Sequence, residues 1–169
     1  MKRILFTIMA AALLFQGCGI LTESREDRAT RLERTAQMVD EGVETGDFKM
    51  EIRMMIPLRG GARHVDNYSV KVKDGHIVSY LPYFGRAWDL PYGGGHGLNF
   101  EADIQESAAF READGSYTVR LLIKTDEDTH VYTFQFFRNG SSSLLVQSKN
   151  REPINFNGDL VFEEEEEKE

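Results

Sequence analysis

Strict alternation of apolar and polar residues near the middle of this chain limits its fold more than any other feature. Every even-numbered residue from Phe48 to Leu58 is apolar, while Lys49, Glu51 and Arg53 between them are charged. A period of two places successive side chains on opposite faces of a β-strand. The segment therefore predicts a half-buried strand with all of its even-numbered side chains directed inward.

The same alternation returns further along the chain, between short turns. Asp74–Gly75, Asp114–Gly115 and Asn139–Gly140 each separate two alternating runs, and such dipeptides favour tight hairpins. The charged residues 126–128 are interpreted as one more hairpin turn, exposed to solvent. Runs with strand character lie near residues 48–58, 68–73, 77–80, 98–104, 108–110, 117–123, 131–137, 144–146, 154–156 and 160–162.

Consecutive hairpins without intervening helices predict a mostly β fold, an antiparallel meander of eight or nine strands. Residues 47–162 are long enough for one such domain, either a curved sheet or a barrel-like, lipocalin-like body. The side chains expected to point inward are bulky, which favours a filled interior. They are Phe48, Tyr68, Phe100, Phe110, Tyr117, Phe134 and Phe136. His76 and His130 are expected at exposed positions beside turns.

One N-terminal α-helix is predicted over residues 24–46. Ala29, Leu32 and Ala36 begin an apolar stripe at helical spacing, and Ser24 is a suitable N-cap. Glycines at positions 42 and 46 mark the end of the helix. A single narrow stripe indicates a helix that packs on the same domain, across an opening or an edge of the sheet.

The first residues have the pattern of a bacterial lipoprotein signal peptide, residues 1–17. Lys2 and Arg3 precede a short apolar run that ends in Gly17–Cys18, and the run is too short for a permanent membrane span. Cys18, the only cysteine, is the expected lipidation site, with acyl chains of the palmitate type and residues 18–23 as a tether. The alternative is an ordinary secretory signal with an incidental cysteine. The prediction is a lipid-anchored protein of the bacterial cell envelope, at the outer membrane and facing the periplasm.

The charge of the chain argues against nucleic acid as a partner. The formal net charge is −8, and loss of the signal peptide would remove two positive charges and no negative ones. An acidic domain is a poor match for phosphate backbones. Residues 163–169 form an acidic block, for which a disordered tail is expected.

The stretch from Ser79 to Gly97 combines five aromatic side chains, two prolines and five glycines. The prolines exclude an ordinary central strand, so the stretch is either a connection that caps the domain or a recognition loop. The candidate binding residues are Tyr83, Arg86, Trp88, Asp89, Tyr92 and His96. Within this loop, Tyr83 and Phe84 are expected to be largely buried, and Trp88 partly exposed at a pocket mouth or a surface patch.

Three segments of the chain resemble a bacterial family known only as domain of unknown function 4251. They are "YSVKVKDGHIVSYLPYFGRA", "PYGGG" and "LNFEADI", and the resemblance covers about residues 30–162. Members of the family look like small envelope lipoproteins, and the resemblance implies one compact, mostly β domain. It implies no activity and no catalytic residue.

Motifs that would carry chemistry are absent from the sequence. It lacks H-E-x-x-H, G-x-S-x-G, a Walker loop and paired C-x-x-C, and the four histidines share no metal-ligand spacing. No cofactor, metal or catalytic residue is therefore predicted. The interpretation is a non-enzymatic module that binds a small ligand or an envelope protein. The alternative is a hydrolase-type enzyme with an unrecognised site near Arg86, Asp89 and His96.

Overall fold

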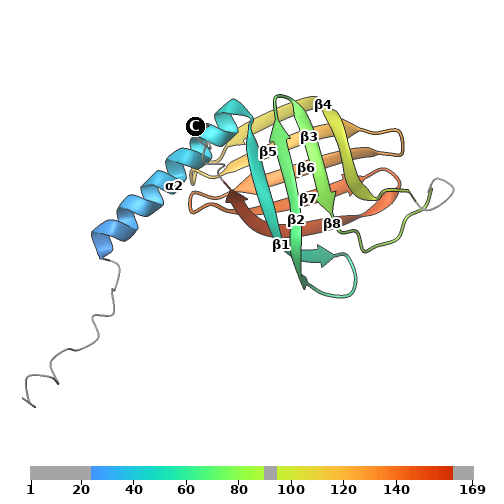
Figure 1. The fold of residues 1–169 in the computed structure, drawn as a ribbon, viewed down its shortest axis with the longest axis horizontal. Coiled ribbons are helices and arrows are strands. Elements are labelled where there is room, and N and C mark those ends of the chain that lie inside the picture. The colour runs from blue at the N-terminus through green and yellow to red at the C-terminus, as the bar shows by residue number, and fades with distance from the viewer. Residues whose placement is uncertain (1–23, 90–94, 162–169) are drawn as a thin grey trace, which may run out of the picture. The chain divides into compact units, whose positions relative to one another are not determined.

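A computed structural model of the chain describes residues 24–89 and 95–161. Within these residues, one helix precedes eight antiparallel strands (Figure 1). They are α2 (Arg25–Thr45), β1 (Phe48–Pro57), β2 (Arg63–Lys73), β3 (His76–Leu81), β4 (Leu98–Arg111), β5 (Tyr117–Lys124), β6 (Thr129–Phe136), β7 (Ser141–Ser148) and β8 (Arg151–Val161). Each strand pairs with the next, and β1 also pairs with β8, which closes a barrel. The expected mostly β meander with an N-terminal helix is confirmed.

Local capping explains where α2 begins and ends. The Oγ atom of Ser24 accepts a hydrogen bond from the backbone N–H of Asp27 at 3.0 Å, as an N-cap does. Gly46 has a φ of 79°, the left-handed conformation that commonly ends a helix. In the described part of the chain, no helix is both long and apolar enough to span a bilayer.

The chain divides into two units within α2, between Arg31 and Leu32. In the second unit, the last part of α2 covers one end of the barrel. Val39 and Val43 belong to the core cluster, and an ion pair of 3.5 Å joins Arg111 at the end of β4 to Asp40. We call this the helix end of the barrel. The opposite end, which holds the β1–β2, β3–β4, β5–β6 and β7–β8 connections, is the loop end.

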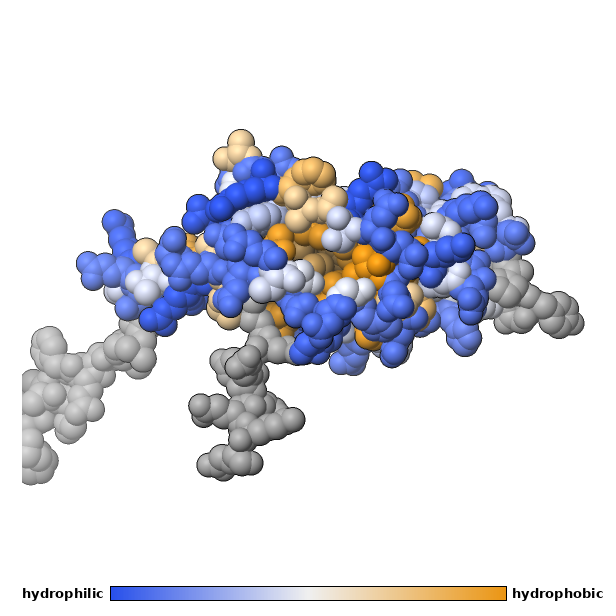
Figure 2. Space-filling view, turned by 90° about the horizontal axis from the view of Figure 1, so that it is seen from above, coloured by the Kyte–Doolittle hydropathy of each residue, from blue (hydrophilic) through white to orange (hydrophobic). Residues whose placement is uncertain are grey.

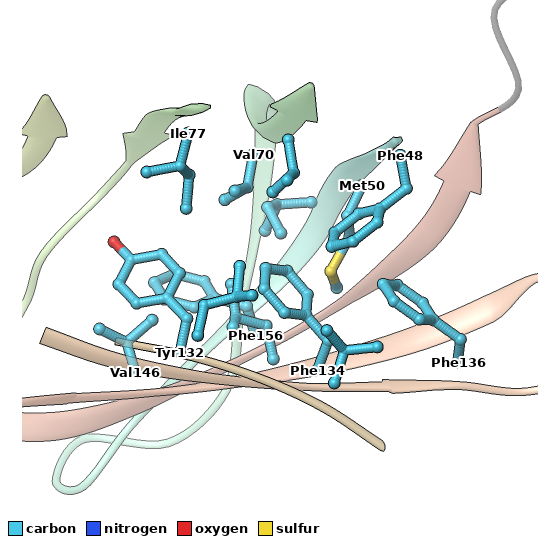
Figure 3. Packing of buried hydrophobic residues seen from close by; sticks show 14 of the residues in the cluster. Phe48, Met50, Val70, Ile77, Tyr132, Phe134, Phe136, Val146 and Phe156 are labelled. Carbon is cyan, nitrogen blue, oxygen red and sulfur yellow. The ribbon is translucent and has the colours of Figure 1, made fainter. Parts of the chain in front are cut away.

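Aromatic rings fill the barrel interior (Figure 3). The even-numbered side chains of β6, Tyr132, Phe134 and Phe136, form a row from the middle of the barrel toward its helix end. The ring of Phe48 on β1 meets Phe134 and Phe136 edge to face, at centroid distances of 5.2 and 4.9 Å. The hydroxyl of Tyr132 donates to Ser79 Oγ at 2.9 Å, and Ser79 donates in turn to a backbone carbonyl at 2.7 Å. The one polar group in the row is therefore satisfied.

Two β-bulges overturn part of the expected inward set. A bulge between Ile52 and Met54 adds a residue to β1 and reverses the faces beyond it. Met55 is consequently buried, and Leu58 is 62% exposed instead of inward. A second bulge lies between Ile104 and Glu106 in β4. The expectation that Phe110 points inward was therefore wrong, since its side chain is 58% exposed.

The inner face of β4 is not fully covered beyond its bulge. Ser107 and Ala109 lie opposite the buried residues Leu121 and Val119 of β5, and directly paired residues share a face of a sheet. Both are nevertheless exposed. Figure 2 shows the molecule from above the view of Figure 1, from the side on which β4 lies. On this side, apolar residues lie in a hollow that charged residues surround.

Candidate functional site at the loop end of the barrel

The β3–β4 connection lies against the start of β8 through backbone contacts. Ala87 forms an isolated antiparallel bridge with Arg151. The N–H of Trp88 donates to the carbonyl of Asn150, and the N–H of Glu152 donates to the carbonyl of Arg86, both at 2.9 Å. The described part of this loop therefore caps the barrel, as the architectural interpretation of the sequence predicts.

Tyr83 fixes the bend of the loop. Its hydroxyl lies 2.8 Å from the carbonyl oxygen of Arg86 and 3.1 Å from that of Glu152. A Cβ atom at position 85 would come within 2.6 Å of this hydroxyl, so any larger residue there would have to displace the Tyr83 ring. Burial raises the pKa of Tyr83 above its usual value, and the phenol is neutral at physiological pH.

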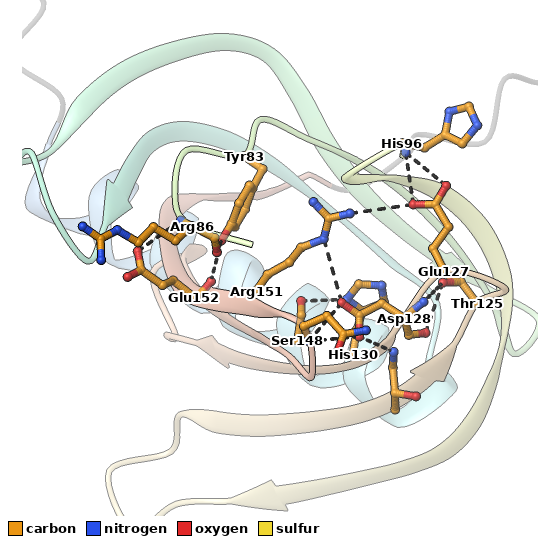
Figure 4. Close-up of polar contacts among 12 residues, drawn as sticks. Tyr83, Arg86, His96, Thr125, Glu127, Asp128, His130, Ser148, Arg151 and Glu152 are labelled. Atoms are coloured by element: carbon orange, nitrogen blue, oxygen red, sulfur yellow. Dashed lines mark hydrogen bonds and ion pairs between the residues drawn. The ribbon is translucent and has the colours of Figure 1, made fainter. Parts of the chain in front are cut away.

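Arg151 is the charged centre of the loop end (Figure 4). It is only 6% exposed, and its guanidinium forms ion pairs with Glu127 at 3.7 Å and Asp128 at 3.8 Å. The ring of Tyr83 lies over it, with the centroid 5.5 Å from Cζ. Buried charges are tolerated only when they are paired. The cluster thus joins the β5–β6 turn, the loop and β8.

The β5–β6 turn is not the solvent-exposed turn that its charges suggest. Asp128 is 7% exposed, and its carboxylate accepts hydrogen bonds from the N–H groups of Thr129 at 2.7 Å and Asn150 at 3.3 Å. Glu127 accepts a hydrogen bond from the backbone N–H of His96 at 3.1 Å. The two carboxylates hold the loop and the β7–β8 turn in place, a role that the composition of the turn does not reveal.

His130 was expected to be exposed, and this was wrong. It is 1% exposed, its ring stacks on Phe100 at a centroid distance of 4.9 Å, and Nδ1 lies 2.8 Å from Ser148 Oγ. Burial lowers its pKa below the usual value, against the opposing charge of Asp128. Its burial could have been predicted from its even-numbered position in β6, because Tyr132, two residues further along, lies on the same face of the strand.

A pocket of about 320 Å³ opens beside this cluster. Six residues line it: Arg59, Tyr83, Phe84, Gly85, Arg86 and Glu152. Glu152 receives a hydrogen bond from the N–H of Arg86 at 3.2 Å and an ion pair from Arg59 at 3.6 Å. In the part of the chain that the structure describes, no side chain pairs with the guanidinium of Arg86. The pocket therefore combines aromatic surface with free guanidinium donors, a combination suited to binding an anion.

The candidate residues of the loop do not converge on one point. Phe84 is 48% exposed, which contradicts the expectation of burial, while Trp88 is 66% exposed, as expected. Tyr83 is half-buried and Asp89 is exposed. Arg86 and His96 lie on opposite sides of Arg151, and the ring of His96 points away from the cluster (Figure 4).

Two of the predicted site residues, Cys18 and Tyr92, lie outside the described residues. Among those described, no group of three or more His, Cys, Asp or Glu side chains is arranged to hold a metal ion.

The fold and this capped loop end define a small, closed antiparallel β-barrel with a helix over one end. Residues 30–160 match the family model described as a domain of unknown function, DUF4251, and the chain belongs to that family. The fold is similar to the crystal structure of a DUF4251 family protein from Bacteroides eggerthii, with a TM-score of 0.59 and 12% sequence identity. The match covers 76% of this chain and 88% of that one. A comparison with curated proteins found no match.

Proposed function

We propose that this protein is a non-enzymatic binding module of the cell envelope, and that it engages its ligand or protein partner with the loop end of the barrel. One observation carries the proposal. Phe84 and Trp88 are the largest exposed apolar groups in the described part of a loop whose backbone is fixed to β8. Aromatic side chains contribute most to binding when they are presented rigidly beside a pocket.

The groups in the pocket favour binding over hydrolysis. The guanidinium groups of Arg59 and Arg86 offer hydrogen-bond donors and no acceptor, so neither can act as a general base. Glu152 is the remaining ionisable residue of the lining besides Tyr83, and it is occupied by Arg59 and a backbone N–H. The hydrolase alternative also needs Arg86 near His96, and the two residues lie apart.

The tether in this proposal is a lipid on Cys18. A basic start, a short apolar run and a cysteine preceded by glycine support it, and an acylated cysteine gives stable anchoring without a membrane-spanning helix. The domain would then sit at the outer membrane and face the periplasm. Replacement of Cys18 by alanine is expected to move the protein from the membrane fraction to the soluble fraction. Retention on membranes after a high-salt wash would contradict the lipid anchor.

Binding at the loop end can be tested in intact cells with a photo-crosslinking amino acid. Placed at position 88, the crosslinker is expected to give a discrete adduct. Placed at Arg120, an exposed position on β5, it is expected to give none. Equal labelling from both positions, or none from position 88, would refute the proposed binding surface.

A further inference from the structure

We propose that the pocket at the loop end binds a carboxylate of an acidic peptide segment, with Arg86 as the residue that recognises it. This inference rests on the proposed function and names the chemistry of the partner.

Positive charge gathers at the mouth of the pocket although the chain as a whole is acidic. Three arginines contribute to this charge. Arg59 and Arg86 line the pocket, and the guanidinium of Arg63 lies 4.2 Å above the ring of Phe84. Glu152 is the one acidic residue among the lining residues. In a chain with a formal net charge of −8, this local excess of cations complements an anionic partner.

Glu152 does not pair with all of the guanidinium N–H donors that line the pocket. Its side chain is 8% exposed and accepts a hydrogen bond from the backbone N–H of Arg86, so the carboxylate is held inside the protein. The side chain of Arg59, by contrast, is 63% exposed and contacts Glu152 at a single distance of 3.6 Å. A guanidinium carries five N–H donors. Arg86 is exposed and its fork is available for a two-pronged contact with a carboxylate.

The size of the pocket and its surroundings favour a peptide over a small free anion. A volume of about 320 Å³ is at the lower limit for small-molecule sites, roughly 300–1,000 Å³, and suits one acidic side chain of a longer segment. Trp88 and Phe84 present apolar surface beside the pocket that a small inorganic anion would leave unused. Exposed aromatic groups next to an arginine are typical of protein interfaces.

Trp88 is the only tryptophan, so its fluorescence reports on this surface without a label. The probe is a blocked peptide of alternating glutamate and glycine, titrated into the purified full-length chain in detergent, with the glutamine counterpart as control. A saturable change in Trp88 emission is expected with the glutamate peptide and not with the glutamine peptide. Arg86→Gln is expected to weaken binding about tenfold or more, as for the loss of a charge-assisted contact. Arg120→Gln, which removes the same charge from β5, is expected to leave binding unchanged.

Several results would overturn the inference. These are equal binding of the glutamine peptide, unchanged binding by Arg86→Gln, or equal loss with Arg120→Gln. Inorganic phosphate that saturates the signal as tightly as the peptide would also overturn it, in favour of a small-anion site. Misfolding does not confuse the result, because Arg86 contacts the rest of the loop end through its backbone.

The inference and the proposed function fail separately. If the crosslink from position 88 forms in cells and survives Arg86→Gln, the binding surface stands and the recognition of a carboxylate is wrong. If no crosslink forms from position 88, the proposed function itself is wrong.

Discussion

Gly158 in β8 is a position where a single methyl group should disrupt the barrel. It is buried and lies opposite Ile52, beside the bulge of β1. A Cβ atom there would overlap the carbonyl oxygen of Glu51, and it would lie 2.8 Å from the carbonyl carbon of Glu51 and 3.1 Å from Cα of Ile52. All three are backbone atoms of a paired strand, so no side-chain rotation can relieve the overlap.

The expected cost of Gly158→Ala follows from these contacts. Overpacking that side chains can absorb costs about 1–3 kcal/mol, and here β1 and β8 must separate instead. Loss of two hydrogen bonds between the strands adds about 0.5–1.5 kcal/mol each. The total is about 2–6 kcal/mol, a large part of the roughly 5–15 kcal/mol by which a domain is stable. For a domain of this size it corresponds to a fall of about 5 °C or more in Tm.

Urea and thermal unfolding followed by circular dichroism measure this cost. Gly75→Ala is the matched control, because Gly75 has a φ of 75° but no atom within 4 Å of an added Cβ. Its free energy of unfolding should fall only by the strain of an alanine in the left-handed conformation, about 1–2 kcal/mol. If Gly158→Ala proves no more destabilising than Gly75→Ala, the close approach of β1 and β8 at the bulge is wrong.

Three further predictions concern the interior and the loop end. Phe134→Ala removes a fully buried ring and should lower the free energy of unfolding by about 3–5 kcal/mol. Phe110→Ala, on the outer face, should lower it by less than about 1 kcal/mol. Similar losses for the two variants in urea melts would contradict the register beyond the β4 bulge. Burial holds the pKa of His130 below its usual value, so the unfolded chain binds more protons as the pH falls through roughly 6.5, and stability is lost from there downward. His130→Phe should therefore lose less stability than the wild type between pH 7.5 and 5.5, and equal losses would show that His130 is not the cause. Trp88→Ala and Phe84→Ala should each change the free energy of unfolding by less than about 1 kcal/mol, since Trp88 is 66% exposed and Phe84, at 48% exposed, also lies at the surface. A larger loss in denaturant melts would place them in the core.

Alternation and turn residues were sufficient to predict the strands, because both act locally. Asp74–Gly75 and Asn139–Gly140 form the hairpins that their residue types favour. The sequence did not reveal the two bulges, since a bulge is set by the register of a partner strand that lies far away in the chain. The alternation was continued through each bulge without a shift, so Phe110 and Leu58 were predicted on the wrong face.

The site was only partly predictable for a related reason. The loop was singled out by its prolines and aromatic residues; the exposure of Trp88 was confirmed, and the role of the loop in binding stays a prediction. Arg151, Asp128 and Glu152 were missed because each looks like an ordinary surface charge until the β5–β6 and β7–β8 turns are brought together. Burial of a charge depends on its partners in space, which no local pattern in the sequence records.

The attachment of the β3–β4 connection to β8 has a consequence for divergence within the family. Main-chain atoms make the contacts of Arg86, Ala87 and Trp88 with β8, and main-chain hydrogen bonds do not depend on which side chain a residue carries. Substitutions at these positions can therefore change the side chains that the loop presents while its course over the barrel stays the same. Under the binding function proposed above, residues 86–88 are the place to exchange side chains when a different specificity is to be engineered.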